Sequence, residues 1–170
     1  ETAAYLIEQT LGNQHKTIIT TQSNEHFLGE ASRERAFEAK IKSNTPKINI
    51  IKIKGGGGVE RPTKNLVYDA IQNIDYVDGV YSMGGGNKSI LSALDDLNLN
   101  PKIFIAHDLD KDNQELLMEK KITFILNHDL THDLKHVFYK FLSSMGLYPP
   151  QPDFIVSNID VITPLNIPKN

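Results

Sequence analysis

This 170-residue sequence contains no cysteine. It also lacks long apolar runs and a strong excess of charge of either sign. Without cysteine there are no disulfides, no thiolate zinc sites and no cysteine nucleophiles. No apolar run approaches the roughly 20 residues that a membrane-spanning helix needs. The formal net charge is -3 and no stretch concentrates lysine and arginine, so the chain offers no electrostatic footprint for nucleic acid. The remaining composition, 39% hydrophobic and 23% charged, is that of an ordinary globular protein.

Short β-rich segments alternate with segments of helical periodicity along the chain. Strands are predicted at residues 17–21, 48–53, 79–83, 102–106 and 122–126, with two late strands at 154–156 and 161–163. Helices are predicted at residues 3–11, 30–41, 62–74, 87–97, 113–120 and 130–142. This alternation predicts an α/β fold, a doubly wound parallel sheet with helices on both faces.

Ligands of such sheets bind beyond the carboxyl ends of the strands, so the residues that follow each strand are the first candidates for a site. Asn87 comes after the glycine turn 84–86 and could direct a two-way hydrogen-bonding amide into a cleft. The alternative is an N-cap of the next helix. Lys88 and Ser89 suggest a phosphate-binding P-loop, but that motif requires glycine where Asn87 stands.

An acidic segment follows the strand that ends at residue 106. Its acidic residues have the spacing of an EF-hand calcium loop: Asp108, Asp110, Asp112 and Glu119. A strand precedes them where an EF-hand needs a helix, which argues against calcium. Asp108 and Asp110 also resemble the aspartate pair of a metal-dependent phosphatase, which stays open as an enzymatic alternative. If Asp110 and Asp112 cap the following helix, Asp108 is the residue expected in the cleft.

His128 follows the strand at 122–126, and Arg33 lies near the start of the helix at 30–41. The guanidinium could clamp a pair of hydroxyls or a carboxylate, although it could also be a solvated helix charge. His132 and His136 continue a four-residue spacing but lie opposite the apolar stripe of their helix, so we expect them to face solvent rather than a metal ion.

The four candidates are therefore Arg33, Asn87, Asp108 and His128. All are hydrogen-bonding groups, and none has the context of an activated nucleophile. This set predicts a carbohydrate-binding site that uses neither a metal nor a cofactor. The protein is therefore predicted not to be an enzyme.

Several segments, taken in order, resemble the C-terminal lobe of the effector domain of LacI/GalR-type regulators and of ribose-type sugar-binding proteins. They are residues 3–7, 33–37, 84–90, 107–109, 122–129 and 160–167. Two positions depart from the family pattern, since Ala36 replaces a glycine and His128 stands where glutamine is usual. By position, Arg33, Asn87, Asp108 and His128 fall on ligand-contacting sites of the family.

The resemblance implies a fold of the periplasmic-binding-protein-like type I. Residues 1–128 would form the C-terminal lobe, residues 129–157 a crossover helix and strand of the N-terminal lobe, and residues 158–170 a return strand and tail. The apolar stripe of the helix at 130–142 would then pack on the N-terminal lobe or on a second copy, or stay exposed.

The function implied is that of a cytoplasmic, homodimeric LacI-type regulator. A sugar bound between the lobes would modulate operator-DNA binding by a helix-turn-helix that precedes this segment. The alternative is a periplasmic sugar-binding protein of a transport system. Since Glu1 already lies inside a helical pattern, we expect further residues before it.

Overall fold

A computed structural model describes residues 1–24, 26–153 and 157–168. Its strands form one six-stranded sheet in the order β2-β1-β3-β4-β5-β6. They are β1 (Lys16–Gln22), β2 (Ile48–Lys54), β3 (Gly79–Ser82), β4 (Ile103–His107), β5 (Phe124–His128) and β6 (Ile159–Ile162). All pairings among β1 to β5 are parallel, which confirms the predicted α/β fold. β6 departs from an all-parallel sheet because it pairs antiparallel with β5. The strand predicted at 154–156 lies outside the described residues.

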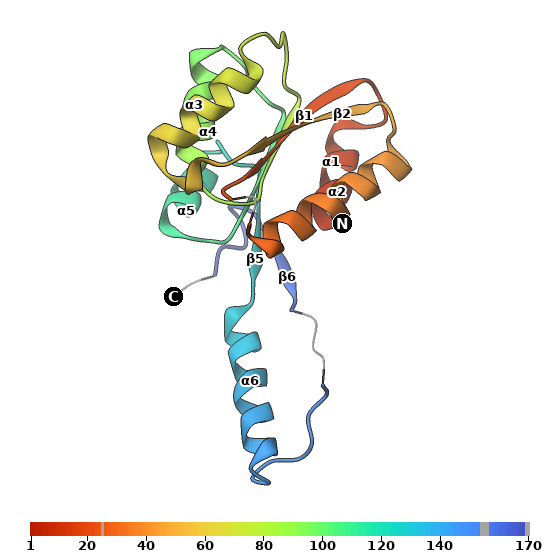
Figure 1. The fold of residues 1–170 in the computed structure, drawn as a ribbon, viewed down its shortest axis with the longest axis vertical. Coiled ribbons are helices and arrows are strands. Elements are labelled where there is room, and N and C mark those ends of the chain that lie inside the picture. The colour runs from red at the N-terminus through yellow and green to blue at the C-terminus, as the bar shows by residue number, and fades with distance from the viewer. Residues whose placement is uncertain (25, 154–156, 169–170) are drawn as a thin grey trace.

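Helices cover both faces of the sheet (Figure 1). α1 (Thr2–Leu11) and α2 (Leu28–Asn44) lie on one face, and α3 (Glu60–Ile71), α4 (Asn87–Asp96) and α5 (Lys111–Met118) lie on the other. Successive strand residues enter opposite cores, as the twofold period of a strand requires. Ile18, for example, packs with α1 and α2, whereas Ile19 packs with α3 and α4. The interior strands are buried on both faces, which explains their continuous apolar sequence.

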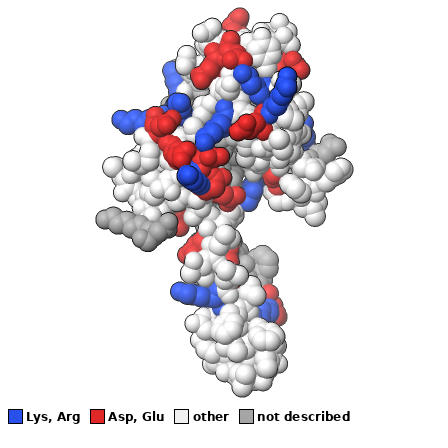
Figure 2. All heavy atoms as spheres, turned by 90° about the vertical axis from the view of Figure 1, so that its left-hand side faces the viewer, with Lys and Arg blue, Asp and Glu red and all other residues white. Residues whose placement is uncertain are grey.

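α6 (Leu130–Ser144) projects away from this body, and the chain then returns to β6 (Figure 1). None of its residues is buried. Its apolar stripe is exposed by more than half at each position: Leu130, Leu134, Val137, Phe138 and Phe141. Figure 2 shows charged side chains gathered over the body, whereas the far end of α6 is almost free of them. Among the described residues, no helix has the length and apolar character to span a membrane.

The histidines of α6 do not behave as predicted. His132 and His136 are half-buried rather than solvent-facing, and their rings contact each other. The expectation was wrong because the chain that returns toward β6 lines a pocket with this side of the helix, at Pro152, Asp153 and Ser157. The apolar stripe is the side that stays open to solvent.

The loops before α4 and α5 differ in how they begin the helix that follows. Asp110 caps α5, since its Oδ1 accepts a hydrogen bond of 2.7 Å from the backbone N–H of Asn113. Asn87 does not cap α4, because Gly86 occupies the N-cap position and Asn87 is the first helical residue. The turn before α4 approaches the end of β1 closely. A Cβ on Gly84 would lie 2.3 Å from the backbone nitrogen of Ser23, so only glycine fits there.

Candidate functional site

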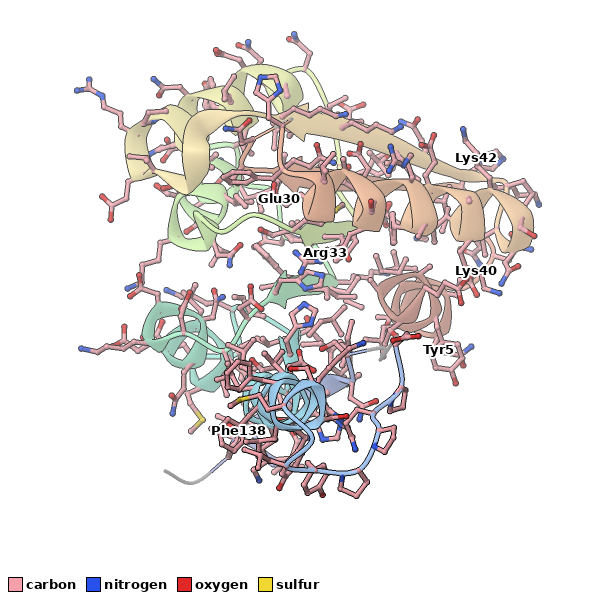
Figure 3. All side chains as sticks on the ribbon, turned by 60° about the horizontal axis from the view of Figure 1, so that its bottom comes forward. Tyr5, Glu30, Arg33, Lys40, Lys42 and Phe138 are labelled. Atoms are coloured by element: carbon pink, nitrogen blue, oxygen red, sulfur yellow. The ribbon has the colours of Figure 1, made fainter. Side chains whose placement is uncertain are left out.

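The candidate site lies at the carboxyl edge of the sheet, on the side from which α6 projects. β5 runs directly into α6, so the carboxyl ends of the parallel strands all point toward the base of that helix (Figure 1). Figure 3 looks onto this edge and shows Arg33 near its centre, with α6 nearest the viewer and Phe138 on that helix.

Two buried carboxylates fix α2 and therefore the place of Arg33. Glu30 accepts hydrogen bonds from the backbone N–H of Ser23 (2.7 Å) and from its hydroxyl (2.6 Å). Glu34 accepts a hydrogen bond of 3.1 Å from the Thr20 hydroxyl and pairs with Lys54 at 3.2 Å. These contacts tie the first turns of α2 to β1, to the residue that follows it and to the end of β2, and leave Arg33 directed across the edge of the sheet.

Arg33 and His128, which are 95 residues apart in the sequence, meet at this edge. A nitrogen of the guanidinium (Nη2) lies 2.8 Å from Nε2 of His128. Because a guanidinium can only donate, Nε2 must accept, and the proton of the neutral imidazole sits on Nδ1. His128 therefore presents an N–H donor on its other side. None of the ion pairs among the described residues includes Arg33 or Asp108.

A buried pair lies beneath these residues and was not predicted from the sequence: Tyr81 and His107. The Tyr81 hydroxyl lies 2.8 Å from Nε2 of His107. Burial, reinforced by the positive charge of Arg33, lowers the pKa of His107 to about 3, and burial raises the pKa of Tyr81 above its usual range. Both groups are therefore neutral near pH 7. Nδ1 of His107 is buried and has no hydrogen-bond partner among the described residues.

These aromatic rings form a row from the core to the edge of the sheet. The ring centroids are 4.8 Å apart from Phe37 to Tyr81, 5.6 Å from Tyr81 to His107 and 6.1 Å from His107 to His128. A pocket of about 280 Å³ lies beside the row and is lined by Arg33, Tyr81 and His107, together with the start of α1. The row gives the site a rigid base, because each ring is held by its neighbour.

Asp108 is the exposed acceptor of the site. It has a φ of 64°, a left-handed conformation that aspartate tolerates better than most residues. The turn is held by Asn113, whose side-chain amide donates to the carbonyl oxygens of His107 (2.9 Å) and Asp108 (2.8 Å). The Asp108 carboxylate lies within 4.8 Å of a ring nitrogen of both His107 and His128.

Two imidazoles and a carboxylate are also a donor set for transition metals, but Arg33 opposes a cation here. Its hydrogen bond occupies Nε2 of His128 and leaves a proton on Nδ1. A metal ion would have to displace Arg33 or remove that proton, beside a permanent positive charge. Hydroxyl groups meet the same surroundings without this conflict, because they donate and accept at once.

Asn87 stands apart from the other three candidates. It is 5% exposed, and its Nδ2 donates a hydrogen bond of 2.6 Å to Oδ1 of Asn113. It therefore supports the Asp108 turn through Asn113 and touches neither Arg33 nor His128 through any hydrogen bond found among the described residues. Its Oδ1 is buried without a hydrogen-bond partner. The expected ligand contact of Asn87 stays a prediction.

No protein-family model and no curated protein matches the sequence. Solved structures match its fold. AraP, an arabinose binding protein from Geobacillus stearothermophilus, matches with a TM-score of 0.81 and 21% identity, over 97% of this chain and 59% of AraP. A sugar-binding protein of a sugar ABC transporter from Bacillus halodurans has a TM-score of 0.80 and 18% identity, over 97% of this chain and 60% of its own.

A third structure is the fructose binding periplasmic domain of the hybrid two component system BT1754. It has a TM-score of 0.81 and 18% identity, and the match covers 97% of this chain and 55% of that domain. The chain thus spans somewhat more than half the length of each of the three structures. The fold is periplasmic-binding-protein-like type I, and the low identities carry the likeness no further than the fold.

Proposed function

We propose that this chain is one lobe, with its crossover helix, of a protein that binds a small sugar without transforming it. One observation carries the proposal. Arg33 and Asp108, a permanent donor and a permanent acceptor, lie at one edge of the sheet with His128, and neither has an oppositely charged partner among the described residues. Neighbouring sugar hydroxyls satisfy both groups, because each hydroxyl accepts from Arg33 or donates to Asp108.

The position of α6 supports a cleft over this edge. α6 leaves the body from the carboxyl end of β5 and exposes its apolar stripe. A second lobe that covers this stripe would face Arg33 and Asp108, so that a sugar would be enclosed between the two lobes. The matched structures, which extend beyond the length of this chain, are consistent with such a second lobe.

Within this fold we favour a sugar-binding protein of a transport system over the LacI-type sensor that the sequence resemblance implied. The three matched structures are named as an arabinose binding protein, a transporter's sugar-binding protein and a fructose binding domain. Operator-DNA binding and a homodimer stay predictions. The phosphatase alternative loses its second aspartate, since Asp110 is engaged as the N-cap of α5.

Titration calorimetry of the full-length protein with neutral aldopentoses, aldohexoses and fructose tests the proposal. We expect one of these sugars to bind with one-to-one stoichiometry. Arg33→Ala and Asp108→Ala should each weaken binding by about 10- to 100-fold, since hydrogen bonds to charged groups contribute ~1.5–3 kcal/mol. Arg35→Ala is the matched control, because Arg35 is exposed on the same helix and bonds only to Ser32 among the described side chains.

Two outcomes would overturn the proposal. One is a folded full-length protein that binds none of these sugars. The other is metal-dependent hydrolysis of a generic phosphate ester that Asp108→Ala abolishes, which would favour the phosphatase.

A further inference from the structure

His132 and His136 form a second cluster of chemically active groups, away from the sugar site. They lie one turn apart on α6, and their Nε2 atoms are 2.8 Å from each other. The ring centroids are 4.3 Å apart, and the rings meet edge to face at 70°. At this distance one Nε2 donates and the other accepts, so the two rings share a single proton between them.

We propose that His132 and His136 form a chelating site for a divalent transition-metal ion of the Zn²⁺, Ni²⁺ or Cu²⁺ class. Histidines at positions i and i+4 of a helix present their nitrogens to one ion, and imidazole suits these borderline metals. The ion takes the place of the shared proton. That proton moves to Nδ1 of its own ring, so binding to the neutral pair changes a tautomer and releases no proton.

The surroundings of the pair permit this exchange. Nδ1 of His136 is buried and has no hydrogen-bond partner among the described residues, so only the bond to His132 decides which nitrogen of that ring carries the proton. A pocket of about 260 Å³ lies on the same side of α6, lined by His136, Asp133, Asp153 and Ser157 among others, and leaves room for water ligands. Asp153 pairs with Lys140, whereas Asp133 has no cationic partner among the described residues and leaves one negative charge beside the pair.

The lysine that lines this pocket bonds to groups other than the histidine pair. Lys140 follows one turn after His136, and its ammonium group donates to Asp153 Oδ1 (3.3 Å) and to the backbone oxygens of Pro152 (3.2 Å) and Asp153 (3.0 Å). This distinguishes the pair from the cluster at the carboxyl edge, where the Arg33 guanidinium is bonded directly to His128.

The ion would stabilise an element that little else holds. No residue of α6 is buried, and short helices without tertiary packing are marginal in water. A ligand that joins positions i and i+4 only when the turn is helical shifts the helix–coil equilibrium toward helix. Metal binding should therefore slow hydrogen exchange of the α6 amides.

Calorimetric titration of the chain with ZnCl₂ or NiCl₂ in a non-chelating buffer tests the site. We expect one metal ion per chain, with His132→Ala and His136→Ala each weakening binding by at least about 10-fold, a loss that even second-shell substitutions cause. His132→Gln and His136→Gln repeat the test with polar side chains of closer size. His15→Ala, at an exposed histidine, is the control and should leave binding unchanged.

Hydrogen exchange of the same proteins provides a second measurement. Zinc should protect the α6 amides of the original chain and of His15→Ala, but not those of the His132 and His136 variants. The proposal is overturned if no metal binds, if binding survives both substitutions, or if His128→Ala and Asp108→Ala abolish it instead. None of these outcomes bears on sugar binding, which is measured separately.

Discussion

Among single residues, Asn87 is one whose substitution can distinguish a structural role from direct contact with a ligand. Its amide donates to Asn113, which in turn holds the carbonyl oxygens of His107 and Asp108. Asn87→Ala removes the partner of a buried oxygen, so we expect the free energy of unfolding to fall by about 1–3 kcal/mol. Urea denaturation measures this change. Lys88→Ala is the control and should alter stability by less than about 1 kcal/mol, because the ion pairs of Lys88 with Asp112 and Glu115 are exposed. Reduced sugar affinity at unchanged stability would make Asn87 a direct ligand contact instead.

His107 predicts a dependence of stability on pH. Its pKa is about 3 in the folded chain, against 6.5 for an unperturbed histidine. As the pH falls below 6.5, the unfolded chain takes up a proton at this residue and the folded chain does not. The stabilisation is thus complete above that pH and is progressively lost toward pH 3, at up to about 1.4 kcal/mol per pH unit.

Urea denaturation at about pH 7.5 and about pH 5.5 checks this slope. His107→Gln, which can still bond to Tyr81, should lose less stability on acidification than the original chain. His15→Gln, at an exposed position, should follow the original chain. Equal losses in all three proteins would show that His107 takes up a proton in the folded state.

Sequence reasoning located most of the site because the carboxyl-end rule needs only the order of strands. The rule placed Asp108 and His128 at one edge, where the structure also has them, but it placed Asn87 there too, which bonds to Asn113 instead. Arg33 was predicted from its position near the start of a helix, and the structure brings it to His128. Tyr81 was not predicted as part of the site, because a tyrosine inside a strand has the pattern of an ordinary core residue. The available signal was the partner: His107 ends the neighbouring strand, and a buried histidine needs a hydrogen bond.

The predicted ends of most helices and strands lie within three residues of the observed ends, because periodicity and turn residues are local signals. α2 is longer than predicted, since its first turn at Leu28 and Gly29 carries no apolar pattern. The antiparallel direction of β6 could not be predicted in this way. The direction of a strand depends on the path of the connection before it, and the residues of β6 itself carry no signal of that path.

α6 should be the least protected helix of the metal-free chain. Its residues are all at least partly exposed, so local unfolding costs little buried apolar contact. We expect its amides to exchange far faster than those of β4, in which every residue is buried. Hydrogen exchange with mass spectrometry measures the contrast. Protection equal to that of β4 would show that another surface covers α6.

At the scale of the whole molecule, the body and α6 differ in what they leave open. The body buries two cores, one under each layer of helices, and its surface carries most of the charge. α6 exposes five large apolar side chains along one stripe. α6, which carries this stripe, projects from the edge of the sheet where the polar groups of the candidate site lie, and the proposed second lobe would cover both.

The exposed stripe predicts self-association of the chain when no second lobe covers it. Leu134 and Phe138 are 68% and 58% exposed, and burying such a side chain contributes about 1.5–3 kcal/mol. Sedimentation should show a concentration-dependent dimer that Leu134→Glu with Phe138→Glu abolishes. Met118→Glu is the control, because Met118 is as exposed as Phe138 (58%) but lies on the body, as the last residue of α5. If a second lobe covers the stripe, as proposed, the double substitution should instead lower the melting temperature of the two-lobed protein, because the stripe would be internal. A chain that stays monomeric at every concentration would leave the stripe without this partner and contradict the prediction.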